Sequence, residues 1–177
     1  MADGASESQA HGALVEVLDI GVLLVGPSGI GKSECALDLV ERGHALVADD
    51  VVRIRKEGSG LIGSAPEVIR YFMEIRGIGL LYLPDLYGPE SVRTSGAIDL
   101  VCRLEEWREG VEFDRVGLER LTEDWAGVAL PVVRLPARPA GSMATLIEAA
   151  VRDHRQRALG SIGAERIDAR LRGEGGA

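Results

Sequence analysis

The feature that most constrains the fold of this chain is a glycine-rich loop between a short apolar run and a predicted helix. Residues 26–33 read GPSGIGKS and match the pattern G-x-x-x-x-G-K-[ST] in full. The apolar run Val22–Val25 precedes the loop and predicts a strand. A helix is predicted over Lys32–Arg42, with Gly43 where a helix C-terminal glycine belongs. A loop in this context indicates an α/β fold with the loop at the carboxyl end of a strand.

The residue types of this loop suit the binding of phosphate. Glycines allow backbone N–H groups to converge on phosphate oxygens without clashes from Cβ atoms, and the helix N-terminus adds partial positive charge. Lys32 is expected to reach the β- and γ-phosphates, and the Ser33 hydroxyl to bind Mg²⁺. ATP and Mg²⁺ are therefore the expected ligands. The predicted nucleotide-binding residues are Gly26, Pro27, Ser28, Gly29, Ile30, Gly31, Lys32 and Ser33.

A pair of acidic residues, Asp49-Asp50, directly follows the apolar run Ala45–Ala48. If this strand and Val22–Val25 belong to a right-handed βαβ unit, the two strands are parallel and their carboxyl ends share one edge of the sheet. One carboxylate there can orient Mg²⁺ while the other takes a proton from an attacking hydroxyl. A capped turn after a strand is the alternative interpretation. No Asn/Thr-Lys-x-Asp motif is present, which argues against a GTPase switch protein.

The remaining chain predicts further elements and a simple domain organisation. Strands are expected over residues 14–18, 51–55, 98–104 and 128–135, the last near an edge or irregular because it contains Pro131. Residues from 61 onward fit a strand or a short helix, and residues 105–110 fit a charged loop. Helices are expected over 142–159 and 162–171. One catalytic domain over 11–171 lies between flexible tails at 1–10 and 172–177.

Composition excludes several classes of protein. The 177 residues suit one domain, and 46% hydrophobic but only 4% aromatic residues predict an aliphatic core. A formal net charge of −8 argues against a basic nucleic-acid-binding surface. No apolar run approaches the roughly 18–20 residues of a membrane span, and no signal peptide is visible. The two cysteines form neither a disulfide framework nor a zinc pattern, so we expect a cytoplasmic protein.

These motifs together resemble a known family. Residues 21–53, which contain the glycine-rich loop and Asp49-Asp50, resemble the catalytic domain of bifunctional HPr kinase/phosphorylase. Residues 73–88, MEIRGIGLLYLPDLYG, are similar to that family's own signature. Shorter matches lie at 11–12, 104–107, 114–117 and 138–139, so the resemblance extends from 11 to about 171. It implies an α/β phosphate-loop kinase core with a mixed sheet, flanking helices and C-terminal helices, in a short form without the N-terminal domain.

The resemblance also implies an activity: transfer of phosphate from ATP to a serine of the carrier protein HPr. In the implied reverse reaction, inorganic phosphate attacks phosphoserine and gives pyrophosphate. The implied partner is HPr or an HPr-like carrier, and the implied assembly is a hexamer. Asp49 would transfer the proton, and Arg115 would neutralise the transferring phosphoryl group. The implied catalytic set is Asp49, Asp50, His11, Arg115 and Lys32, and the implied metal ligands are Ser33, Glu74 and Asp50.

Two departures from the family pattern and several alternatives accompany this interpretation. Pro27 stands where the family usually has an acidic residue, and residues 138–142 read RPAGS rather than RPGRN. Each candidate residue also has an alternative role outside the site. His11 could be a structural histidine, and Arg115 could be a solvated charge in an acidic loop. Glu74 and Arg76 could pair with each other or face solvent. At the level of function, a small-molecule hydroxyl kinase and a nucleotide-binding sensor without turnover remain open.

Overall fold

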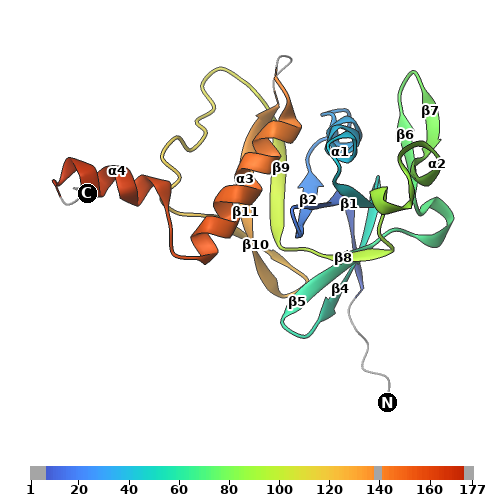
Figure 1. The fold of residues 1–177 in the computed structure, drawn as a ribbon, viewed down its shortest axis with the longest axis horizontal. Helices are drawn as coiled ribbons and strands as arrows, with labels where there is room; N and C mark the ends of the chain where they lie inside the picture. The colour runs from blue at the N-terminus through green and yellow to red at the C-terminus, as the bar shows by residue number, and fades with distance from the viewer. Residues whose placement is uncertain (1–6, 138–140, 174–177) are drawn as a thin grey trace.

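The computed structural model describes residues 7–137 and 141–173, which form a mixed α/β fold (Figure 1). Its helices are α1 (Lys32–Glu41), α2 (Leu83–Tyr87), α3 (Met143–Ala158) and α4 (Gly163–Leu171), with short 3₁₀ turns at Glu67–Ile69 and Pro89–Ser91. Its strands are β1 (Ser8–Val17), β2 (Ile20–Val25), β3 (Ala45–Ala48), β4 (Val51–Glu57), β5 (Gly60–Ser64), β6 (Phe72–Ile75), β7 (Gly79–Tyr82), β8 (Ser95–Ala97), β9 (Leu100–Glu106), β10 (Leu121–Trp125) and β11 (Val128–Ala137).

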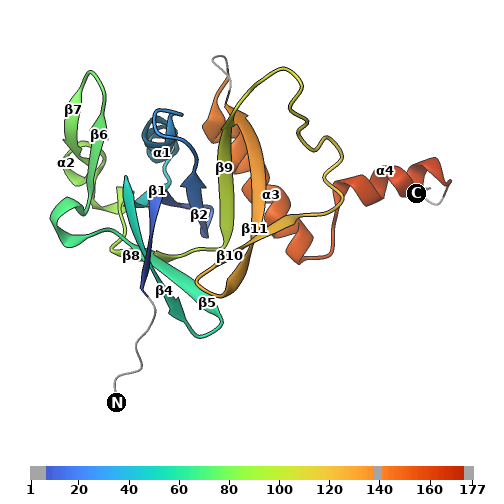
Figure 2. The same ribbon diagram turned by 180° about the vertical axis from the view of Figure 1, so that it is seen from behind.

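Nine strands form one mixed sheet, in the order β10-β11-β9-β2-β1-β4-β5-β8, with β3 paired to β1. β2, β9 and β11 are parallel neighbours, whereas the other pairings are antiparallel. Helices α1 and α3 pack together on one face, as Figures 1 and 2 show from opposite sides. A buried aliphatic cluster lies under these helices and a second lies on the other face, as the 4% aromatic content predicts.

Strand β1 lies at the centre of this arrangement because it pairs along both of its edges. On one edge, Gly12–Val17 pairs with the whole of β2. On the other edge, Ser8–His11 pairs with β4 and Leu14–Glu16 pairs with β3. Strands β2 and β3 therefore run in the same direction with β1 between them, which confirms the expected parallel orientation and adds an intervening strand. The phosphate loop after β2 and the acidic pair after β3 consequently meet at one edge of the sheet.

Most of the predicted elements are confirmed. Helices α1, α3 and α4 match their expected ranges within two residues, and the open choice after residue 61 is resolved as strand β5. Ser142 caps α3, since its side chain accepts a hydrogen bond from the Thr145 N–H at 3.3 Å. The turn before β2 is tight, with Leu18 and Asp19 both in the left-handed region at φ +50° and +65°.

Two expectations about element boundaries are wrong. Residues 8–10 are not a tail, because their pairing with β4 extends β1 and buries Ala10. Glu105 and Glu106 continue β9 rather than forming a loop, since both pair with β11. The expectation that β11 lies near an edge is confirmed, because only β10 lies outside it in the sheet. Pro131 is tolerated there because the parallel ladder with β9 begins only at Val132.

Two features complete the fold. Helix α4 projects away from the rest of the chain (Figures 1 and 2). Ile167 and Leu171 on this helix are exposed, as is Leu159 at the end of α3. Over the residues that the structure describes, no helix is both long and apolar enough to cross a lipid bilayer.

Gly21 offers a test of this packing. A Cβ atom added at Gly21 would lie 1.6 Å from the backbone oxygen of Ala97, and the Gly21 N–H donates to Asp99 Oδ2 at 2.8 Å. Because the obstacle is backbone, we expect Gly21→Ala to lower the free energy of unfolding by about 3 kcal/mol or more. Urea denaturation measures the change. Gly60→Ala is the matched control, since its nearest neighbour is 4.0 Å away, and an equal loss in both variants would contradict the packing.

Candidate active site

The phosphate loop is held in shape by glycine conformations and by the neighbouring strand. Gly31 adopts φ +99°, a left-handed conformation that favours glycine, directly before α1 begins at Lys32. A Cβ atom at Gly26 would approach the Leu104 backbone oxygen to 2.5 Å, so β9 packs directly against the loop. The sequence pattern of the loop therefore reflects two steric requirements as well as phosphate chemistry.

Lys32 is one of the few buried charged residues, with 8% of its surface exposed. Its Nζ donates hydrogen bonds of 2.9 Å to the backbone oxygens of Gly26 and Pro27. Burial lowers the pKa of Lys32, and the nearby carboxylates of Asp49, Asp50 and Glu34 oppose that shift. The ammonium is thus folded back along the loop, and Lys32 lines the cavity that the loop borders.

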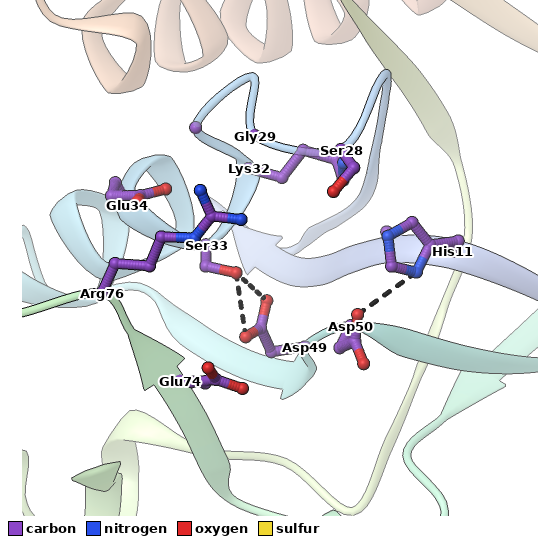
Figure 3. Close-up of a pocket in the computed structure, with 12 residues that line it drawn as sticks. His11, Ser28, Gly29, Lys32, Ser33, Glu34, Asp49, Asp50, Glu74 and Arg76 are labelled. Atoms are coloured by element: carbon purple, nitrogen blue, oxygen red, sulfur yellow. Dashed lines mark hydrogen bonds and ion pairs between the residues drawn. The ribbon is translucent and has the colours of Figure 1, made fainter. Parts of the chain in front are cut away.

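Asp49 lies at the end of β3 with only 6% of its surface exposed. The Ser33 hydroxyl is within hydrogen-bond distance of both carboxylate oxygens, at 2.9 and 3.0 Å (Figure 3). Burial raises the pKa of Asp49 to about 6, although the hydrogen bonds from Ser33 and from the Asp50 backbone favour the charged form. A carboxyl with a pKa near neutrality can both accept and return a proton in that pH range, which suits acid–base chemistry.

Asp50 and His11 form an exposed pair beside Asp49. His11 pairs with Val51 in the β1–β4 register, which places its ring next to Asp50, and Nδ1 lies 3.2 Å from Asp50 Oδ1. Asp50 adopts φ +68°, an uncommon conformation for a residue other than glycine. Its backbone oxygen accepts a hydrogen bond of 3.0 Å from Gly12 N–H. The turn between β3 and β4 is therefore fixed by β1.

The β6–β7 hairpin contributes Glu74 and Arg76 to the same site. Along β6, Met73 and Ile75 are buried in the core under α1, so the alternation of strand side chains turns Glu74 outward. Figure 3 shows Glu74 below Asp49 and the Arg76 guanidinium directed toward Ser33. Together with the phosphate loop, these side chains line a cavity of about 210 Å³. Its lining comprises His11, Gly12, Ser28, Gly29, Gly31, Lys32, Ser33, Glu34, Asp49, Asp50, Glu74 and Arg76.

The oxygen atoms that line this cavity could hold Mg²⁺ only together with a phosphate ligand. Within the described ranges, no group of three or more His, Cys, Asp or Glu side chains is close enough to hold a metal alone. Mg²⁺ commonly uses one or two carboxylates and completes its shell with waters and substrate phosphates. The Ser33 hydroxyl with Asp49, Asp50 and Glu74 supplies oxygen ligands of that kind around the cavity.

Most of the predicted site residues meet at this cavity, but not all. His11, Lys32, Asp49, Asp50 and Glu74 line it, as do four residues of the phosphate loop besides Lys32. Gly26 and Pro27 line a neighbouring cavity, and Ile30 lies between two lining glycines.

Arg115 lies elsewhere, in the connection between β9 and β10, where it borders a separate cavity with Phe113 and Pro136. The structure therefore does not bring Arg115 to the phosphate loop, and its catalytic role stays a prediction. Residues 138–140, part of the second departure from the family pattern, lie outside the described residues.

Comparison with known proteins agrees with this geometry. The sequence profile described as HPr Serine kinase C-terminal domain matches residues 3–171. The chain belongs to this family. It is 52% identical to the HPr kinase/phosphorylase of Caldanaerobacter subterraneus subsp. tengcongensis over 94% of this chain and 55% of that relative. It is 45% identical to the HPr kinase/phosphorylase of Geobacter sulfurreducens over 91% of this chain and 51% of that relative. It thus spans about half the length of these curated relatives.

A solved structure shares the fold of this family member. The Hpr(Ser) kinase/phosphatase from Coxiella burnetii superposes with a TM-score of 0.80 at 35% sequence identity. The match covers 86% of this chain and 93% of the Coxiella chain. The mixed sheet with flanking and C-terminal helices is therefore confirmed as the fold of an HPr kinase.

Sequence reasoning missed two charged residues of the cavity, Glu34 and Arg76. Glu34 follows the phosphate loop in the first turn of α1, a position that its place in the sequence could have identified. Arg76 follows Glu74 by two residues, the spacing at which strand side chains share a face. The alternative in which Glu74 and Arg76 pair with each other is not observed, since within the described ranges neither residue has an ion-pair partner within 4.0 Å.

The raised pKa of Asp49 predicts that this residue reduces stability at neutral pH. Because its pKa is about 6 in the folded state and about 4 when unfolded, the folded state binds more protons between these values. Stability contributed by this site is therefore lost as pH rises from 4 to 6. We expect Asp49→Asn to be about 2–3 kcal/mol more stable relative to wild type at pH 7.5 than at pH 4. Urea denaturation at both pH values measures this, and a pH-independent difference would contradict the buried carboxyl.

Proposed function

We propose that this protein is an ATP-dependent protein-serine kinase that phosphorylates HPr or an HPr-like carrier and also catalyses phosphorolysis of the resulting phosphoserine. The observation that best supports the proposal is the contact between Ser33 of the phosphate loop and the buried Asp49, because a buried carboxyl beside this loop is suited to exchange a proton during phosphoryl transfer. Family membership and the names of the curated relatives support the choice of HPr as acceptor.

In the kinase direction, Asp49 acts as the general base. The seryl oxygen of the carrier forms a bond to the γ-phosphorus of ATP while the bond from that phosphorus to the β-phosphate oxygen breaks. The seryl proton passes to the Asp49 carboxylate, and ADP leaves with the electron pair of the broken bond. Lys32 and the backbone N–H groups of the loop residues 28–33 bind the phosphate oxygens.

In the phosphorylase direction, the same carboxyl acts as the general acid. An oxygen of inorganic phosphate bonds to the seryl phosphorus, and the seryl oxygen leaves with a proton from Asp49. The nucleophilic phosphate restores that proton to Asp49, so phosphate and phosphoserine yield pyrophosphate and serine without a further reactant. The seryl oxygen loses its proton when its bond to phosphorus forms and regains one when that bond breaks, so the same carboxyl serves both directions.

The remaining expectations complete the proposal. Mg²⁺ would be held by Ser33, Asp50 and Glu74 together with phosphate oxygens, and when bound it neutralises phosphate charge. His11 orients Asp50, and Arg115 serves the phosphoryl group if the connection between β9 and β10 approaches the loop. The protein would act in the cytoplasm as a homo-oligomer, a hexamer by resemblance.

Mass spectrometry of the acceptor tests this function. Incubation of the protein with HPr, Mg²⁺ and ATP should add 80 Da to HPr at a serine, and later addition of inorganic phosphate should remove it and release pyrophosphate. Asp49→Asn should lower both rates by about 10²–10⁴-fold while ATP binding persists. ATP turnover on a metabolite with no seryl protein labelled would refute the kinase assignment, and phosphoserine that resists phosphate would refute the phosphorylase assignment.

The pKa of Asp49 also predicts opposite pH dependences for the two directions. The kinase needs the carboxylate, so its kcat/KM should fall below pH 6, whereas phosphorolysis needs the protonated form and should fall above pH 6. Initial rates of both reactions between pH 5 and 8 give the ratio of the phosphorolysis rate to the kinase rate. This ratio should rise as pH decreases. A ratio that stays constant over this range would contradict the role of Asp49.

A further inference from the structure

Negative side chains outnumber positive ones around the active-site cavity, although the proposed function requires it to bind anionic phosphate groups. Four carboxylates line the cavity, whereas lysine and arginine contribute one side chain each among the described residues. Two of the three ammonium hydrogens of Lys32 already bond to backbone oxygens of the loop, which leaves one for a phosphate oxygen. The acidic lining residues are Glu34, Asp49, Asp50 and Glu74, and the cations are Lys32 and Arg76.

Arg76 is the arginine that lines this cavity among the described residues. Its side chain is exposed, forms no ion pair among the described residues, and is directed into the cavity from the end of β6 (Figure 3). The hairpin that carries it is anchored, because Met73 and Ile75 are buried with 1% and 6% of their surfaces exposed. A free guanidinium on an anchored strand is suited to hold phosphate oxygens in a fixed place, since its planar fork can donate two parallel hydrogen bonds.

The position of Arg76 within the cavity indicates which phosphate it serves. Figure 3 shows its guanidinium near Ser33 and Glu34, in the first turn of α1, across the cavity from the His11–Asp50 pair. Phosphate chains bind along the N-terminus of the helix that follows such a loop. The attacking and leaving oxygens of an in-line transfer lie on opposite sides of the phosphorus. Arg76 is therefore on the ATP side of the cavity, and the His11–Asp50 pair is on the other.

We propose that Arg76 is a catalytic residue that binds the donor-side phosphates. In kinase turnover it would hold the phosphate oxygens of ATP that leave with ADP, and in phosphorolysis it would hold the inorganic phosphate that attacks. The latter role rests on the proposed function. Its guanidinium offsets the repulsion that Glu34, on the same side, exerts on these anions.

Titration with pyrophosphate tests the binding role without requiring turnover. Loss of a charged hydrogen-bond donor should weaken pyrophosphate binding by about 10–100-fold in Arg76→Gln, and Arg76→Lys should recover part of the affinity. Arg55→Gln is the matched control, because Arg55 is exposed on β4, pairs with Glu57 and does not line the cavity. Arg76→Gln with the affinity of wild type would overturn the proposal.

Steady-state kinetics of phosphorolysis tests which phosphate Arg76 holds. In Arg76→Gln, the KM for inorganic phosphate should rise about 10-fold or more, while the KM for phosphorylated HPr stays within about twofold of wild type. A rise confined to the KM for phosphorylated HPr would place Arg76 on the acceptor side and overturn the proposal. If the wild-type protein does not act on HPr at all, the proposed function fails, and the pyrophosphate titration still decides the role of Arg76.

Discussion

The site depends on the two-sided pairing of strand β1. One edge of this strand holds β2, which leads into the phosphate loop, and the other holds β3 and β4, which meet at Asp49 and Asp50. The same register places His11 beside Asp50. The phosphate loop, the Asp49-Asp50 turn and His11 are distant in sequence. The backbone hydrogen bonds of one strand, β1, thus bring all three to one cavity.

The second constraint is the cost of burying charge within that framework. Asp49 is nearly inaccessible to water, and burial raises its pKa to about 6 despite its contact with Ser33. Lys32 experiences the opposite shift for the same reason. A buried acid with a pKa near neutrality costs stability but can exchange protons in either direction. This is the property that a reversible phosphoryl transfer requires of one carboxyl.

How much could be predicted from sequence depends on how local the determinant is. The phosphate loop and helix α1 were predictable because glycine spacing, capping and the apolar run lie within one short segment. The position of Asp49-Asp50 at the cavity was also predictable, since chain direction determines the edge of the sheet at which β3 ends.

The misses depend on contacts between segments that no local pattern encodes. Strand β10, with the sequence LTEDW, has too few apolar residues for its sequence to predict a strand. It is a strand because it pairs with β11. Arg76 joins the cavity only because its hairpin is anchored through Met73 and Ile75. Arg115, a site residue by resemblance alone, lies in a long connection and borders a separate cavity, so its catalytic role stays a prediction.

The most direct test of this account is a measurement of the Asp49 pKa. Carbon-13 NMR of the aspartate carboxyl groups, with the signal assigned by its absence in Asp49→Asn, follows the titration of this residue in the nucleotide-free protein. We expect a midpoint near pH 6, well above the ordinary value of an aspartate carboxyl. A midpoint near pH 4 would contradict it, because Asp49 would then be an ordinary carboxylate with no proton to return at neutral pH.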